Sequence, residues 1–116
     1  MAYLDRVEDE KISKLREILS AKSGRPVSFG WGPRFLHSTG QFHKGGQQNG
    51  SFLQITGETS ADLKIPGQSF DFKTLLMAQA LGDSDALAKR KCPLLRFHLK
   101  NRSAGIDQIL KAAIAL

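Results

Sequence analysis

Apolar residues recur at helical spacing in two stretches of the chain, one near each end. The first follows Asp5 and Glu8, which are spaced as in a capping box, and it runs to Gly24, a residue suited to a left-handed C-cap. The second follows Ser103, a candidate N-cap, and repeats apolar residues at i, i+3, i+4, i+7 and i+8. Both patterns predict amphipathic helices that cover one side of a larger structure. The apolar residues are Ile12, Leu15, Ile18 and Leu19 in the first stretch and Ile106, Ile109, Leu110, Ala113 and Ile114 in the second.

Alternation of apolar and more polar residues predicts strands in the middle and late parts of the chain. Within residues 51–56, Leu53 and Ile55 alternate with their neighbours, and residues 94–99 form the most strand-like segment of the sequence. Residues 1–4 read like the end of a strand, and the β-prone residues 27–30 predict a brief one. The chain is therefore expected to build a sheet from several short strands.

Helical segments separate these strands. Asp71 is a candidate N-cap for a helix whose apolar residues run up to Gly82, which predicts its end there. Asp83 or Ser84 is expected to begin a further short helix, and residues 65–68 read as a turn. Strands joined by helical connections favour a mainly parallel sheet with packed helices, which is an α/β fold. Residues 1–116 are expected to form a single domain.

Composition narrows the class of protein. The chain has 116 residues, of which 41% are hydrophobic and 24% are charged, as is typical of one globular domain. Its apolar runs stay well short of the roughly 20 residues that cross a bilayer. Residues 1–14 lack the apolar core of a secretory signal, so a cytoplasmic protein is expected. Cys92 is the one cysteine, has no disulfide partner within the chain and is predicted to be a small buried residue.

The net charge of +6 brings polyanions into consideration as partners. However, the basic residues are spread along the chain, acidic residues lie among the early ones, and no DNA- or RNA-binding motif accompanies them. The basic run at residues 89–91 falls in the last turn of a predicted helix, where positive charge suits the helix dipole. A small phosphorylated ligand explains the same charge, so nucleic acid is the less favoured partner.

Residues 35–46 gather most of the side chains that could carry chemistry. His37 can act as a general acid or base near neutral pH, or it can simply hydrogen-bond the loop backbone. His43 and Lys44 lie beside glycines that would let backbone amides approach an anion. The phosphate-loop and dinucleotide-binding fingerprints are absent from the sequence. This segment is therefore the predicted site, with an anionic ligand favoured over a nucleotide.

Two other chemistries have little support in the same segment. A metal site at His37 and His43 would need a third ligand, and the remaining histidine, His98, has no acidic neighbour in sequence. Ser38 or Thr39 could serve as a nucleophile only with a base and an orienting group, and no nucleophile-elbow pattern is present. No metal is expected.

The loop and several later segments resemble the C-terminal end of the glucose-6-phosphate isomerase part of bacterial transaldolase/phosphoglucose isomerase fusion proteins. The likeness covers nearly the whole chain, in order and with matching gaps. The segments that carry it are Gly32-Pro33-Arg34-Phe35-Leu36-His37-Ser38-Thr39-Gly40-Gln41, His43-Lys44-Gly45-Gly46, Phe52-Leu53-Gln54-Ile55-Thr56, Ile65-Pro66-Gly67, Ala78-Gln79-Ala80-Leu81-Gly82-Asp83 and the strand from Leu94 to Leu99.

This resemblance implies a layered sugar-isomerase (SIS-like) domain fragment, from an enzyme that interconverts glucose 6-phosphate and fructose 6-phosphate without a cofactor. Residues 37–41 are also similar to the histidine motif of ordinary phosphoglucose isomerases. There the histidine helps to open the sugar ring and is contributed across a dimer interface. On this resemblance His37 is the expected catalytic residue and Gln41 supports it at the substrate. Arg34, His43 and Lys44 are further expected contacts for the sugar phosphate.

The chain departs from that family in two respects. Residues 69–71 are similar to the sequence that precedes a late-helix lysine in conventional isomerases, but the corresponding position here is Gln79. The family's carboxylate base and its Ser/Thr loop for the phosphate lie upstream of the region that this chain resembles. The isolated chain is therefore expected to be inactive and to act with the rest of an isomerase chain, and a homodimer stays open. The alternative is a non-catalytic module that binds a sugar phosphate or serves as an assembly surface.

Overall fold

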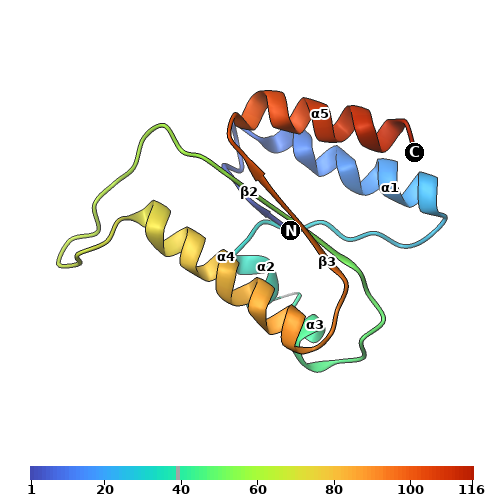
Figure 1. The fold of residues 1–116 in the computed structure, drawn as a ribbon, viewed down its shortest axis with the longest axis horizontal. Coiled ribbons are helices and arrows are strands. Elements are labelled where there is room, and N and C mark those ends of the chain that lie inside the picture. Colours follow the sequence, from blue (N-terminus) through green and yellow to red (C-terminus); the bar gives the residue numbers. More distant parts are fainter. Residues whose placement is uncertain (39) are drawn as a thin grey trace.

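A parallel β-sheet lies between two groups of helices in the computed structural model, which describes residues 1–38 and 40–116 (Figure 1). Helices α1 and α5 lie together on one face of the sheet, and α2, α3 and α4 lie on the other. The elements are, in order, β1 (Ala2–Tyr3), the 3-10 helix η1 (Glu10–Lys14), α1 (Leu15–Ser23), α2 (Arg34–His37), α3 (Phe42–Gly45), β2 (Phe52–Gly57), α4 (Phe72–Lys89), β3 (Leu94–Leu99) and α5 (Arg102–Ile114).

The strands lie in the order β1-β2-β3, and every pair is parallel. Ile55 of β2 is in register with Ala2 on one side and with Phe97 on the other. This arrangement confirms the predicted α/β fold with a mainly parallel sheet. The strand predicted at residues 27–30 is wrong, because the segment meets β1 only at its end: the Gly30 carbonyl accepts a hydrogen bond from the Ala2 amide, and Trp31 forms a single bridge to Ala2.

The face covered by α1 and α5 holds an apolar core. Ile55 and Leu99 of the sheet pack there with Ile12, Leu15 and Ile106. Gly24 ends α1 in the left-handed conformation with φ of 64°, as predicted. The predicted start at Asp5 is wrong, because its carboxylate accepts hydrogen bonds from the amides of residues 7 and 8 within a turn, and helical structure begins only with η1 at Glu10. The predicted cap at Ser103 is wrong, because Asn101 accepts the hydrogen bond from the Ala104 amide and so begins α5 two residues earlier.

The opposite face is crossed by one long helix, α4. Asp71 caps it as predicted, accepting a hydrogen bond of 2.9 Å from the Thr74 amide. The predicted end at Gly82 and the separate helix after it are wrong, since α4 continues through both to Lys89. Packing against the sheet overrides the weak helical preference of one glycine, because it buries Asp83 and Leu87 on the following turns.

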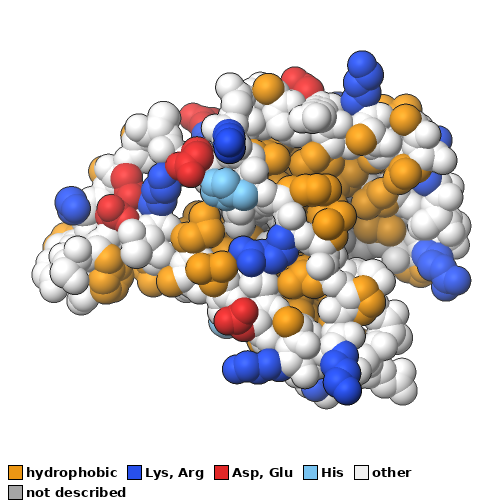
Figure 2. Space-filling view, in the orientation of Figure 1, with side chains coloured by type: hydrophobic (Ala, Val, Ile, Leu, Met, Phe, Trp, Pro, Cys, Tyr) orange, Lys and Arg blue, Asp and Glu red, His pale blue; other side chains and the backbone are white. Residues whose placement is uncertain are grey.

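Two further features of the fold bear on the sequence predictions. Cys92 is 7% exposed and packs with Leu36 and Leu87, which confirms its role as a small buried residue. Leu95 and Phe97 of β3 remain exposed, and Figure 2 shows apolar side chains gathered across the middle of this side of the molecule. Of the helices described, none combines the length and the apolar character that crossing a membrane requires.

Candidate functional site

A buried carboxylate joins three separate elements on the α4 side of the sheet. Asp83 is 2% exposed, yet it contacts Tyr3 of β1, His37 of α2 and Lys44 of α3. The Tyr3 hydroxyl donates to Asp83 Oδ2 at 2.5 Å, while Lys44 Nζ and His37 Nε2 lie 2.7 and 3.2 Å from Oδ1. A buried charge needs such partners, because an unpaired one would be expensive to desolvate. We call Tyr3, His37, Lys44 and Asp83 the Asp83 cluster.

Tyr3 holds the inner side of this carboxylate. Its side chain is buried against α4, and burial, followed by the hydrogen bond to Asp83 and the charge of Asp83, raises the pKa of the Tyr3 phenol well above its usual value. The phenol therefore remains a hydrogen-bond donor through the neutral range. One carboxylate oxygen is fully engaged inside the protein, and only the other faces the basic side chains.

Lys44 and His37 share that second oxygen but differ in exposure. The Lys44 side chain is 25% exposed, whereas the His37 side chain is 56% exposed. Lys44 therefore acts as an internal counter-ion that neutralises Asp83. His37 is anchored through Nε2 and presents the rest of its ring to solvent, which is the arrangement that a general acid or base requires.

The short helices α2 and α3 bring the two basic residues together. Between them the chain folds back so closely that the Gly40 amide donates to the Phe35 carbonyl at 2.6 Å. A Cβ atom at Gly40 would lie only 2.7 Å from that carbonyl oxygen, so a larger residue would force the backbone apart. Gly40 thus allows the turn that places His37 and Lys44 on one side of Asp83.

The remaining predicted contacts lie outside the cluster. Arg34 and Gln41 are exposed at the starts of α2 and α3. The His43 ring packs instead among phenylalanines, with ring centroids 5.9, 5.7 and 5.0 Å from those of Phe35, Phe42 and Phe52. The structure therefore brings His37 and Lys44 together but gives His43 an aromatic packing environment.

The structure also bears on the two hydroxyls considered as nucleophiles and on the metal hypothesis. The Ser38 hydroxyl donates to the Arg34 carbonyl at 2.7 Å, and Thr39 lies outside the described residues. Across residues 1–38 and 40–116, no group of three or more His, Cys, Asp or Glu side chains is placed to hold a metal ion.

A second buried polar residue extends this layer toward β3. Gln54 is fully buried, and its side-chain amide donates to the Ala80 carbonyl of α4 at 2.7 Å. Arg96 of β3 donates through Nε to Gln54 Oε1 at 2.8 Å. The hydrogen-bonding groups of Gln54 are thereby satisfied, and α4 is fixed in position over the sheet.

Sequence reasoning missed Tyr3 and Asp83 as members of the site. A signal was present for Asp83, which lies three residues after Ala80 and four before Leu87, on the buried face of a helix. An aspartate on such a face requires a partner. For Tyr3 the sequence held no comparable signal, because its contact with Asp83 joins residues 80 positions apart.

Comparisons with known proteins bear on the fold and do not identify an activity. No protein-family model and no curated protein matches the chain. Among solved structures, the chain is similar to the hypothetical protein TT0462 from Thermus thermophilus, with a TM-score of 0.66 and 19% sequence identity. The match covers 88% of this chain and 29% of the Thermus chain, so this chain spans under a third of the length of that neighbour. At this identity the likeness shows a shared fold.

Proposed function

We propose that the chain is the C-terminal part of a glucose-6-phosphate isomerase, and that the complete enzyme interconverts glucose 6-phosphate and fructose 6-phosphate. The supporting observation is that His37 and Lys44 meet on a single buried carboxylate oxygen, with the His37 ring open to solvent. The motif resemblance singles out the same histidine. The proposal unites the sequence motif with a local geometry suited to acid/base chemistry.

In this proposal His37 catalyses the opening of the sugar ring. The His37 imidazolium donates a proton to the ring oxygen as the bond from that oxygen to the anomeric carbon breaks, and a solvent water molecule takes the proton that the anomeric hydroxyl loses as the carbonyl forms. Asp83 does not touch the sugar; its contact with His37 Nε2 orients the imidazole. Tyr3 in turn fixes the carboxylate.

Lys44 supplies the ammonium of the proposed site. The family position that carries a lysine is Gln79 here, one turn before Asp83 on α4. Lys44 Nζ instead reaches Asp83 from α3, beside His37. The positive charge next to the histidine thus comes from a different element of the chain.

The proton transfer between neighbouring sugar carbons requires a carboxylate base that we assign to the remainder of the isomerase chain. The 116-residue chain alone is therefore expected to show no turnover of fructose 6-phosphate in an assay coupled to glucose-6-phosphate dehydrogenase. Turnover above the rate without protein would contradict this division of the site.

The role of His37 is tested in a complete isomerase that contains this segment. Replacing His37 with Asn should lower kcat by roughly a hundredfold or more, the usual range for loss of a general acid/base. The matched control is His98→Asn, because His98 binds Thr56 and Glu58 away from the cluster. Equal rates for wild type and His37→Asn would remove the assigned role.

An assembly or binding module is the second candidate, and the exposed Leu95 and Phe97 on β3 favour it. In that case the chain binds a sugar phosphate or a neighbouring subunit without taking part in the reaction. Titration with fructose 6-phosphate, followed by amide NMR, distinguishes the two uses: shifts confined to residues 40–46 indicate ligand binding, and their absence with a concentration-dependent change at β3 indicates assembly.

A further inference from the structure

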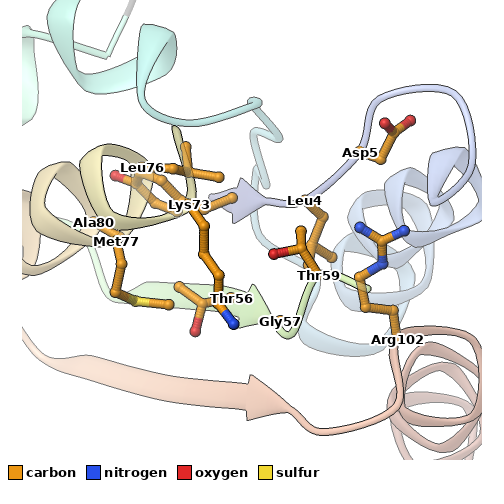
Figure 3. Close-up of a pocket in the computed structure, with 11 residues that line it drawn as sticks. Leu4, Asp5, Thr56, Gly57, Thr59, Lys73, Leu76, Met77, Ala80 and Arg102 are labelled. Carbon is orange, nitrogen blue, oxygen red and sulfur yellow. The ribbon is translucent and has the colours of Figure 1, made fainter. Parts of the chain in front are cut away.

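A pocket separate from the exposed side of the Asp83 cluster opens where β1 and β2 end (Figure 3). Its volume is about 190 Å³. It lies between α4, the loop after β2 and the first residue of α5, at the edge of a parallel sheet where α/β proteins commonly bind ligands. Tyr3 lines this pocket and also donates through its hydroxyl to Asp83, so the tyrosine lies between the two sites.

The walls of the pocket are mostly apolar. Leu76, Met77 and Ala80 of α4 form one side, and Leu4 lies on the other. A cavity of roughly 150 Å³ in an apolar protein interior accepts a molecule the size of benzene. The space here therefore suits a short apolar body.

Polar groups converge at one end of this apolar space. The Lys73 side chain runs from α4 across the pocket and ends beside Thr56 (Figure 3). Thr59 follows β2, and its hydroxyl is turned toward Lys73. Among the described residues this buried hydroxyl has no hydrogen-bond partner, although a buried polar atom normally has one. An ammonium and an unpaired hydroxyl donor thus face the same space.

We propose that the pocket binds a small organic monocarboxylate, with its carboxylate held by Lys73 Nζ and Thr59 Oγ1 and its apolar body among Leu76, Met77 and Ala80. Lys73 pairs with Glu58 at 2.6 Å, but both side chains are 40% or more exposed, so a ligand carboxylate can replace Glu58 at little cost. Arg102 is already held by Glu8 and Asp9 and is not required as a ligand. The proposal does not depend on the isomerase assignment.

The charge around the pocket favours a monoanion over a phosphate. Asp5 lines the rim and Glu58 lies on Lys73, so a dianion would meet two carboxylates with one available ammonium. The apolar walls would also leave most phosphate oxygens without donors. A carboxylate exposes less charge and places its hydrocarbon part against those walls.

The test is an amide NMR titration of the 116-residue chain with butyrate, with butyramide as the uncharged match and inorganic phosphate as the charged one. We expect saturable shifts at residues 56–59 and 73–80 with butyrate only. Equal shifts with butyramide, or shifts spread over surface lysines, would overturn the proposal. So would tighter binding of phosphate than of butyrate at these residues.

Two substitutions assign the binding groups. Lys73→Met keeps the apolar stem of the side chain, and Thr59→Val keeps its shape. Each substitution should raise the dissociation constant for butyrate by roughly fivefold or more, as expected for loss of one hydrogen bond or ion pair. Lys89→Met makes the same charge change at the far end of α4 and should leave affinity unchanged. Unchanged affinity in both pocket variants, or an equal loss in Lys89→Met, would refute the assignment. If one pocket variant fails to fold, the other and the butyramide comparison still decide.

Discussion

The two faces of the sheet are built from the same strands but differ in chemistry. On β2, Leu53 and Ile55 point to the face covered by α1 and α5, where the core is apolar. Gln54 points to the face covered by α4, where it binds the Ala80 carbonyl and Arg96. One strand thus supplies hydrophobic burial on one side and a hydrogen-bonded layer on the other, because successive side chains of a strand alternate.

This difference separates the residues that stabilise the fold from those of the proposed site. The apolar face stabilises the protein through the apolar surface that it buries. The α4 face contains Asp83 and Gln54, whose burial requires specific partners in fixed positions. Those partners include His37 and Lys44 of the proposed site, so the need to pair Asp83 fixes the positions of both side chains. We expect substitutions on the two faces to have different effects.

The largest effect on stability is expected at the apolar face. Ile106 of α5 is fully buried, so Ile106→Ala should lower the free energy of unfolding by about 2–5 kcal/mol through lost burial and a cavity. Ile114→Ala, on the same helix but 59% exposed, is the matched control and should cost well under half as much. Urea unfolding measures both, and equal losses would contradict the core assigned to this face.

A smaller effect is expected from the carboxylate of the polar face. Asp83→Asn keeps the shape and can still accept from Tyr3, but it leaves Lys44 without its counter-ion and should cost about 1–3 kcal/mol. Asp85→Asn makes the same change at an exposed position of α4 and should cost little. Urea unfolding of the pair is the measurement. If Asp83→Asn were as stable as the wild type, the charge of Asp83 would not stabilise the fold.

Tyr3 gives a pH-dependent test of the same face. At neutral pH, Tyr3→Phe should cost about 1 kcal/mol, for one hydrogen bond. Because the folded pKa of the phenol is raised, its contribution is fully present below the ordinary value of 10.0 and is lost as pH rises above it. The wild type should therefore lose up to about 1.4 kcal/mol per pH unit above pH 10 relative to Tyr3→Phe.

The measurement for Tyr3 is urea unfolding of both proteins at stepped alkaline pH. Tyr3 is the one tyrosine of the chain, so near-UV absorbance of tyrosinate reports its ionisation directly. Lysine titration affects wild type and variant alike and cancels in the difference. Ionisation of Tyr3 near pH 10 while the protein stays folded would show that the phenol is not buried against Asp83.

The smallest effect is expected at the start of α4. Hydrogen bonds from Thr74 lower the pKa of the Asp71 carboxyl to about 2. Its stabilising contribution is therefore present above its ordinary pKa of 3.8 and is lost as pH falls toward 2. Asp71→Asn keeps a capping side chain that does not titrate, so its stability should fall less steeply in acid. Parallel acid dependences in urea unfolding would contradict this role.

Much of the secondary structure could be predicted because its causes are local. The alternation at Leu53 and Ile55 indicated β2, and capping chemistry located the start of α4 at Asp71 and the end of α1 at Gly24. The strand expected at residues 27–30 does not form because β-propensity does not ensure pairing, and β1 bonds to this segment only at its end. Local signals were sufficient at Asp71 and Gly24, where the partner atoms lie within a few residues.

The sequence by itself determined the alternation that divides the sheet into two faces, the caps at Gly24 and Asp71, and the loop in which His37 and Lys44 lie. Only the tertiary structure decided that α4 passes through Gly82, that Asp83 is thereby buried, and that Tyr3 meets it across 80 residues. The physical reason is that burial is a property of packed elements. A carboxylate selects its partners only once the sheet and helix around it have excluded water.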